Sequence, residues 1–264
     1  MHLPSPAPSD TPATAARDDL QRLRRALLAS LAFVAALVAT YVAQGAFDAR
    51  LFAVSPWSAQ GLIGLLTAPL LHGSLEHIVA NAISVLMLGT LAGGVYPRAT
   101  LLALPLLWLG SGLGAWLLGT PGSHHLGASG LTHGLMFLVF SLGLLRRDRP
   151  AIAAAMIAFM FYGGMLLTVL PREPGVSWQS HLGGAVAGVL AALLLRHRDP
   201  VAPRRRYSWE DEDTLEDEGA RSRRDEFGLP SPEDVPVLWR RDQPPADDAD
   251  DGRGRVLQFP PRER

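Results

Sequence analysis

The sequence predicts an all-α fold, a polytopic membrane protein with six transmembrane helices. Six apolar runs of roughly 15–21 residues follow one another, and a straight crossing of a bilayer needs about 20 residues. Arginine supplies all 24 basic residues and lies at alternate ends of these runs. Hydrophobic residues make up 48% of the chain although its last quarter is polar. These observations together predict a six-helix bundle in a lipid bilayer.

Charge and composition divide the chain into three parts. Residues 1–25 are rich in proline and alanine, and we expect a disordered arm. Residues 26–196 form the predicted membrane domain. Residues 197–264 hold 18 of the 25 acidic and 13 of the 24 basic residues. A segment of that composition cannot bury a core, so a disordered, charged C-terminal tail is predicted.

The predicted spans follow in order at 26–45, 75–94, 98–118, 129–145, 151–170 and 181–195. The first span is too long for the apolar part of a signal peptide, so we expect it to be retained. Residues 46–74 are too broken by polar residues to span and too apolar for a free loop. An interfacial, partly inserted element is the prediction for this stretch.

Arginine placement sets the expected orientation. One set of ends carries only Arg50 and Arg172. The opposite ends carry all the others near the spans: Arg22, Arg24, Arg25, Arg98, Arg146, Arg147, Arg149, Arg196, Arg198, Arg204, Arg205 and Arg206. Loops rich in arginine stay in the cytoplasm. We therefore expect both termini to be cytoplasmic.

Composition also excludes several kinds of chemistry. The chain has no cysteine, which excludes disulfides, thiolate metal ligands and thiol catalysis. His124 and His125 are adjacent, but no HExxH pattern or carboxylate cluster accompanies them, so we predict no metal site. We expect no cofactor and no nucleic-acid partner.

Few polar residues border the bilayer, and they are the candidates for function because such residues are costly there. They are His77, Asn81, Ser129, His133 and His181. Ser129 lies 17 residues before Arg146, His181 lies 15 before Arg196 and Asn81 lies 17 before Arg98. At about 1.5 Å per residue these counts place the three residues about 22–26 Å above the cytoplasmic face, at one common level.

Two glycine faces allow the helices that carry these residues to approach closely. Gly130 and Gly134 lie on the fourth span, and Gly184 and Gly188 lie on the sixth. Small residues spaced four apart let membrane helices pack at short range. The faces serve packing alone, or they also bring one hydroxyl group to within about 3 Å of an imidazole ring.

A serine–histidine dyad is the chemistry that this arrangement predicts. Ser129 would be the nucleophile and His181 the general base, with no acidic third member. The backbone N–H groups at the start of the fourth span, with His77 and Asn81, would donate to an oxyanion. The alternatives are a helix N-cap role for Ser129 and helix–helix hydrogen bonds for His77 and Asn81.

Three motifs in order, LHGSLEHIVAN at 71–81, GASG at 127–130 and HLGGAVAG at 181–188, resemble the rhomboid intramembrane serine proteases. The resemblance covers about 26–196. It implies a nucleophile at Ser129, a base at His181 and an oxyanion site at His77 and Asn81. It further implies that 46–74 is the membrane-embedded first loop and that the loop 171–180 covers the site.

By the same resemblance the protein would lie in the plasma (inner) membrane and cleave transmembrane protein substrates. The residues expected to support the site are Gly127, Gly130, His133 and His72. The sequence carries no signal of an oligomeric state.

The chain departs from the family pattern at three positions. Trp57 is followed by Ser58 and not by arginine, Ser180 replaces the usual alanine, and His133 replaces an aromatic residue. His133 either stacks on the catalytic ring or is a second titrating group beside the dyad.

Two other functions are compatible with a polytopic fold. One is a catalytically silent rhomboid-like protein that binds transmembrane clients, which a missing serine or histidine would mark. The other is a small transporter, which predicts polar residues at the midplane.

Overall fold

The computed structural model describes residues 12–172 and 175–200, and its regular elements in that part of the chain are all helical. The long helices are α1 (Pro12–Ala43), α3 (Leu75–Val95), α4 (Pro97–Leu118), α5 (Ser129–Arg146), α6 (Arg149–Tyr162) and α8 (Trp178–Leu195). The short ones are η1 (Gln44–Ala46), η2 (Ala49–Phe52), η3 (Gln60–Leu62), α2 (Gly64–Thr67), η4 (Ala68–Leu70) and α7 (Met165–Thr168).

Five of these helices are long and apolar enough to cross a membrane: α1, α3, α4, α5 and α8. The protein is therefore a multi-pass, all-helical membrane protein, but the predicted count of six spans is not confirmed. The run predicted as the fifth span, 151–170, is divided. Its main helix α6 has 14 residues, short of the about 20 of a straight crossing. Two consecutive glycines, Gly163 and Gly164, separate it from the four-residue α7.

Helix α1 corrects the prediction for the N-terminal arm. The arm was expected to be disordered through residue 25, but α1 begins at Pro12. Proline suits the first turn of a helix, because the N–H group that it lacks would have had no partner there. Alanine, arginine, leucine and aspartate follow with no glycine or proline, so nothing interrupts the helix. At 32 residues α1 is about 48 Å long, longer than the ~30 Å core of a bilayer. Residues 1–11 lie outside the described residues.

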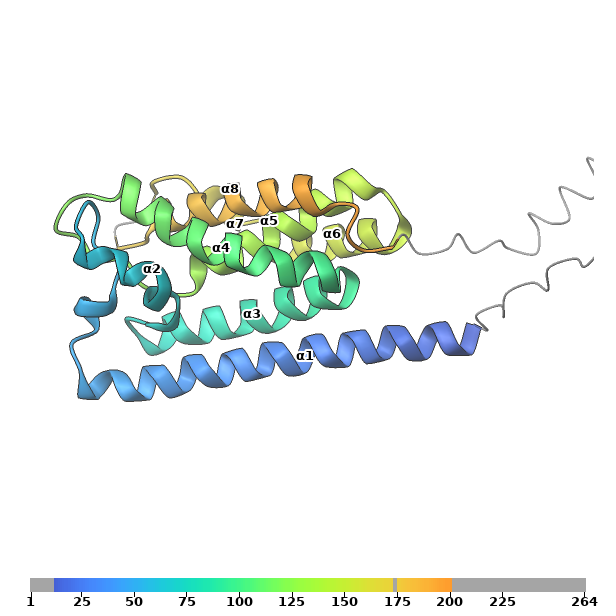
Figure 1. Cartoon of the computed structure of the whole chain (residues 1–264), viewed down its shortest axis with the longest axis horizontal. Helices are drawn as coiled ribbons and strands as arrows, with labels where there is room; N and C mark the ends of the chain where they lie inside the picture. Colours follow the sequence, from blue (N-terminus) through green and yellow to red (C-terminus); the bar gives the residue numbers. More distant parts are fainter. Residues whose placement is uncertain (1–11, 173–174, 201–264) are drawn as a thin grey trace, which may run out of the picture. The chain divides into compact units, whose positions relative to one another are not determined.

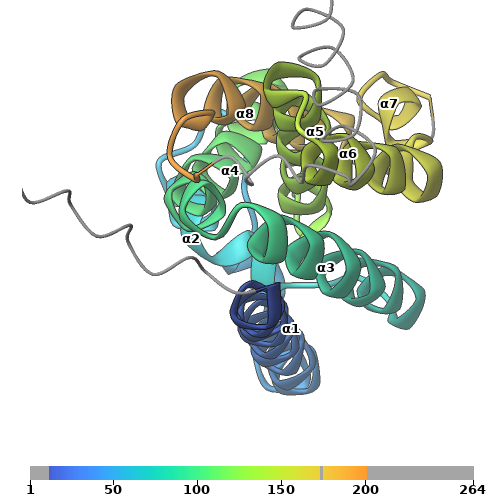
Figure 2. The same ribbon diagram turned by 90° about the vertical axis from the view of Figure 1, so that its right-hand side faces the viewer.

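Helices α4, α5 and α8 form the centre of the bundle, and α8 packs against both of the others. Their shared core includes Leu107, Met136, Leu138, Val139 and Ala191, each without exposed surface. Helix α3 connects this centre to α1, which lies at the edge of the bundle (Figure 1; Figure 2). Helix α6 packs on α5. The N-termini of α3, α5 and α8 share one end of the bundle, beside α2 (Figure 1).

The predicted glycine faces lie in direct contact. A side chain at Gly184 would meet the backbone oxygen of Gly130, and one at Gly188 would meet that of Gly134. Gly183 of α8 packs in the same way against Gly110 and Gly114 of α4. Backbone against backbone is the closest approach that two helices can make, so the N-terminal turns of α5 and α8 are held together.

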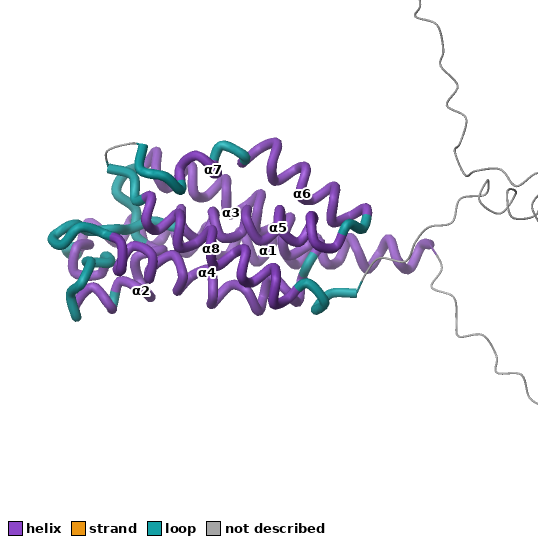
Figure 3. Tube along the Cα trace, turned by 90° about the horizontal axis from the view of Figure 1, so that it is seen from above, coloured by secondary structure: helices purple, strands orange, loops and turns teal. Residues whose placement is uncertain are grey.

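The segment 46–74 contains no helix long enough to span. It lies at the α2 end of the bundle (Figure 3). Two tryptophan side chains of α4 anchor it: Trp108 donates to the carbonyl of Leu66 at 3.2 Å and Trp116 to that of Ser58 at 3.1 Å. The ring of Trp57 lies 5.3 Å from that of Trp116. Trp57 therefore packs on α4, while Ser58, at the position where the family pattern has arginine, accepts from Trp116 through its backbone carbonyl.

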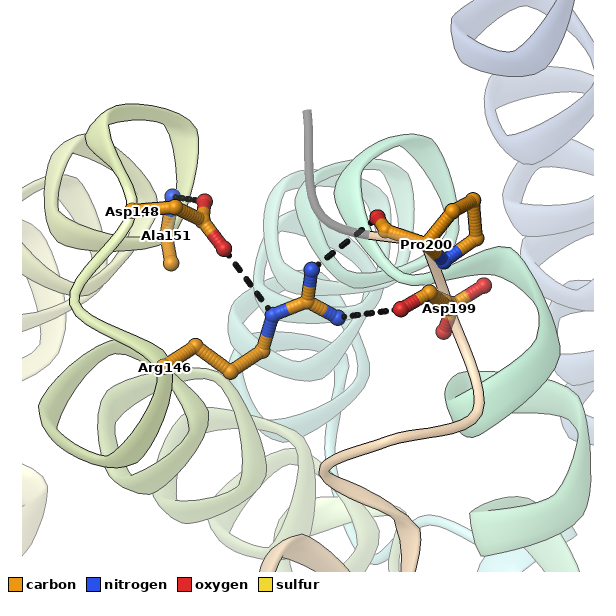
Figure 4. Close-up of polar contacts among 5 residues, drawn as sticks. All are labelled: Arg146, Asp148, Ala151, Asp199 and Pro200. Carbon is orange, nitrogen blue, oxygen red and sulfur yellow. Dashed lines mark hydrogen bonds and ion pairs between the residues drawn. The ribbon is translucent and has the colours of Figure 1, made fainter. Parts of the chain in front are cut away.

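The opposite end of the bundle is closed by a polar cluster that includes residues predicted to be part of the tail (Figure 4). The Asp199 carboxylate accepts hydrogen bonds from the backbone N–H groups of Arg98 (3.0 Å) and Ala99 (2.9 Å). The Arg146 guanidinium donates to the carbonyls of Asp199 and Pro200 and to the Asp148 carboxylate, each at 3.0 Å.

Asp199 is 5% exposed, so the ordered chain continues past the predicted start of the tail at 197. The physical reason is that the first N–H groups of α4 have no partner within the helix, and a carboxylate supplies one. Residues 201–264 lie outside the described residues. The arginines also lie at this end, as the sequence predicts. Leu23 and Ala26 of α1 pack on Gly94 and Gly93 near the end of α3, and this contact brings the neighbouring arginines of α1 to the same end.

Candidate active site

Ser129 and His181 meet at the α2 end of the bundle. Ser129 is the first residue of α5, and His181 lies in the first turn of α8. The Oγ of Ser129 lies 2.9 Å from the Nε2 of His181. The glycine contacts described above hold these two turns together. The close approach of this hydroxyl and this imidazole, which the two glycine faces allow, is therefore present.

The other nitrogen of His181 fixes the tautomer of the ring. Its Nδ1 lies 3.0 Å from the backbone carbonyl oxygen of Thr168. A carbonyl oxygen can only accept, so Nδ1 carries the proton and donates it. The Nε2 atom then has a free lone pair, and the Ser129 hydroxyl donates to it. This is the protonation state that a general base for Ser129 requires.

His133 lies directly on the ring of His181. The two ring centroids are 3.9 Å apart and the planes differ by 11°. His133 therefore stacks on the ring of His181, which is one of the two roles predicted for it. Its Nδ1 donates to the carbonyl of Ser129 at 2.6 Å, and its Nε2 lies 2.8 Å from the Thr168 hydroxyl.

The loop before Ser129 requires glycine at position 127. Gly127 has a φ of +118°, a conformation that side chains rarely adopt. A Cβ there would also lie 2.5 Å from a ring carbon of His77. The next residue, Ala128, donates its N–H to the Nε2 of His72 at 3.5 Å. The turn that presents Ser129 therefore contacts two histidines: His77, which the resemblance places at the oxyanion site, and His72, which was expected to support the site.

His77 and Asn81 have different surroundings. The ring of His77 contacts Gly127, two residues before Ser129, and lies 5.0 Å from the His72 ring. The amide of Asn81 donates to the carbonyl of His77 at 3.1 Å, and Asn81 is 4% exposed. The structure thus places His77 against the nucleophile loop, whereas the hydrogen bond described for Asn81 stays within α3.

His72 lies between η4 and α3, outside the long helices, and is 1% exposed. The side chain of Gln44 makes two 2.9 Å hydrogen bonds with its backbone. Burial, with a smaller contribution from His77, lowers the pKa of His72 to about 4. The ring is therefore neutral at physiological pH, as an acceptor for the Ala128 N–H group must be.

His125 belongs to a separate loop contact. Its ring lies 2.7 Å from the Ser177 hydroxyl and 2.8 Å from the Ser123 hydroxyl, and its backbone pairs with Val54. It thereby links the first loop to the start of α8. Burial is the main cause that lowers the pKa of His125. Within the described ranges no group of three or more His, Asp or Glu side chains could hold a metal ion.

Sequence reasoning missed two contributors to this site. The first is Thr168, which contacts both stacked rings and follows the Gly163–Gly164 break. The second is Ser111 of α4, whose hydroxyl lies 2.8 Å from that of Ser180, with both groups against Gly130. The only signal for the pair was the replacement of the usual alanine by Ser180.

The fold and the paired Ser129 and His181 define a multi-pass helical membrane protein with a serine–histidine pair near one end of the bundle. The Rhomboid domain model matches residues 59–198, more than half of the chain. The protein belongs to the rhomboid family.

Similar proteins occur in mycobacteria. The uncharacterized proteins Rv1337 of Mycobacterium tuberculosis and Mb1372 of Mycobacterium bovis are each 41% identical over 150 residues, 54% of this chain and 62% of theirs. The uncharacterized protein ML1171 of Mycobacterium leprae is 40% identical over 142 residues, 51% of this chain and 56% of its own. The matched region thus spans less than two thirds of the length of these relatives.

Proposed function

We propose that this protein is an intramembrane serine endopeptidase that cleaves transmembrane or juxtamembrane segments of membrane proteins. Membership of a family that generally includes such proteases supports the activity. The observation that carries the proposal is the 2.9 Å contact between the Ser129 hydroxyl and the Nε2 of His181, in the tautomer that can accept a proton.

In the proposed reaction His181 takes the hydroxyl proton as Ser129 attacks the scissile carbonyl. The negative charge that develops on the carbonyl oxygen needs donors. The free N–H groups at the start of α5 and the side chain of His77 are the candidates, with Asn81 as a further one. His181 then gives its proton to the leaving amine, and water hydrolyses the acyl-enzyme by the same route in reverse.

The proposed substrate class follows from the shielding of backbone amides within a transmembrane helix. A substrate helix shields its amides, so it must unwind locally before its carbonyl can reach Ser129. Segments that contain helix-breaking residues are therefore the proposed substrates. The arginine distribution supports a plasma-membrane location with cytoplasmic termini. The dyad would then lie near the exterior face.

The test is cleavage of a model transmembrane substrate in proteoliposomes. Ser129→Ala should reduce cleavage to background while the thermal unfolding midpoint stays close to that of the wild type. Ser123→Ala is the matched control, because Ser123 also contacts a histidine, His125, but donates its hydroxyl to the carbonyl of Thr120. Full cleavage by Ser129→Ala would refute the proposal.

Labelling with a fluorophosphonate probe separates a protease from a silent client-binding protein. An activated serine reacts with the probe, whereas a serine that only caps a helix does not. We expect labelling of the wild type and of Ser123→Ala, and none of Ser129→Ala or His181→Ala.

A further inference from the structure

Thr168 contacts both stacked rings from the side opposite to their contacts with Ser129: it faces the Nε2 of His133 and the Nδ1 of His181, whereas Ser129 faces the other nitrogen of each ring. It closes α7, the four-residue helix that follows the break at Gly163 and Gly164. Its backbone carbonyl lies 3.0 Å from the Nδ1 of His181, and its hydroxyl lies 2.8 Å from the Nε2 of His133. We propose that Thr168 is a positioning residue, which sets the tautomer of His181 through its carbonyl and holds the stacked His133 ring through its hydroxyl.

The hydrogen-bond donors and acceptors around the His133 ring support the proposal. The Nδ1 of His133 faces the carbonyl of Ser129 at 2.6 Å and must donate to it. The Nε2 of His133 is then an acceptor, and the Thr168 hydroxyl is the donor that faces it at 2.8 Å. The carbonyl of Met165 is a second acceptor for the same hydroxyl, at the longer distance of 3.1 Å. Both rings consequently carry their proton on Nδ1. A phenylalanine or tyrosine at position 133 could stack on His181, but its ring edge could not accept from Thr168.

Three helices are joined through this arrangement. The Thr168 carbonyl on α7 contacts α8, its hydroxyl contacts α5, and the two rings contact each other with centroids 3.9 Å apart. Each ring is held at its Nδ1 by a backbone carbonyl and on one face by the other ring. A displacement of α7 would therefore disturb the direction of the His181 lone pair toward Ser129. This inference rests on the proposed function for its effect on catalysis.

The first test is a double-mutant cycle on cleavage rate. Thr168→Val keeps the shape and the carbonyl but removes the hydroxyl, and should lower kcat about 3- to 10-fold with little change in KM. Thr168→Ser should retain most of the activity. In a His133→Phe background, Thr168→Val should have almost no further effect, because the hydroxyl then has no ring nitrogen to hold. An equal loss in both backgrounds would overturn the proposal.

The matched control is Thr100→Val in α4. Thr168 is half-buried, whereas Thr100 is buried, and the Thr100 hydroxyl has no hydrogen-bond partner among the described residues. Thr100 also lies near the opposite end of the bundle. This variant should keep the wild-type kcat. A loss as large as that of Thr168→Val would mean that the loss of a threonine hydroxyl far from the dyad has the same effect, and would count against a positioning role.

The second test does not depend on proteolysis. Nitrogen-15 spectra of protein labelled on histidine report the tautomer of each ring, and His133→Phe and His181→Ala assign the two signals. We expect both rings to carry their proton on Nδ1. In Thr168→Val, only the Nε2 signal of His133 should change. An Nε2–H form for either ring would refute the geometry. If these spectra are observed but the protein cleaves no substrate, the proposed protease activity is refuted. The role of Thr168 in holding the two rings then still stands.

Discussion

The hydroxyl groups of Ser111 and Ser180 lie 2.8 Å apart in the buried contact between α4 and α8. Both lie where a side chain at Gly130 would be, directly behind the proposed nucleophile. The pair therefore ties α4 to the turn of α8 that carries His181. It also gives Ser180, which takes the place of the family's usual alanine, a partner that alanine would lack.

We expect Ser180→Ala to lower the free energy of unfolding by about 1–3 kcal/mol, because the Ser111 hydroxyl is left buried without a partner. Ser111→Ala should have a similar effect. The double variant should cost less than the sum of the two, because neither hydroxyl is then left unpaired. Thermal or denaturant unfolding in detergent measures all three, and strictly additive losses would show that the two groups are not coupled.

Gly184→Ala should separate α5 from α8. The added methyl group would meet the backbone oxygen of Gly130, which a flexible side chain cannot relieve. Overpacking of this kind costs about 1–3 kcal/mol. A shift of about 1 Å between nucleophile and base can lower kcat about 100-fold.

The matched control for that variant is Gly45→Ala, where a new Cβ would have no atom within 4 Å. Cleavage assays and unfolding curves on both variants test the prediction. Wild-type activity in Gly184→Ala would mean that the close contact is not needed for the dyad.

Acidification should destabilise the protein through His72. Its pKa is about 4 in the folded protein, below the ordinary value of 6.5. As the pH falls from 6.5 toward 4, the unfolded chain binds a proton that the folded protein does not, so stability falls across that window and is unaffected above it. The unfolding midpoint of the wild type should therefore drop more steeply between pH 7 and pH 4.5 than that of His72→Gln. Parallel curves for the two proteins would contradict this prediction.

Asp199→Ala should destabilise the end of the bundle that carries the arginines. The variant leaves the N–H groups of Arg98 and Ala99 without their acceptor, and loss of such a cap costs about 0.5–2 kcal/mol. Asp19→Ala is the comparison, because the ion pair of Asp19 with Arg22 is exposed and should contribute almost nothing. Equal unfolding midpoints for the two variants would show that the Asp199 contacts are not stabilising.

The sequence predicts the positions of the long helices and the meeting of Ser129 with His181, because both follow from patterns that side chains carry. Arginines mark the helix ends, and glycines spaced four apart mark where two helices touch. The division of the predicted fifth span depends on Gly163 and Gly164, and two glycines in an apolar run do not by themselves tell a break from a packing face.

The contacts that the sequence does not reveal are made by groups with no distinguishing pattern. Every residue has a backbone carbonyl, so nothing marks that of Thr168 as the acceptor for His181. Ser111 is a small polar residue in an apolar helix, which is common in membrane helices and has many uses. The roles of His77 and Asn81 as oxyanion donors stay predictions.

The acceptor for the first turn of α4 lies about a hundred residues further along the chain, at Asp199. During synthesis α4 is complete long before that carboxylate leaves the ribosome. The start of α4 can therefore acquire its final partner only after α8 has been made. Asp199 would then bind the start of α4 only after all the helices have been made. A nascent chain that stops at residue 198 would lack this contact.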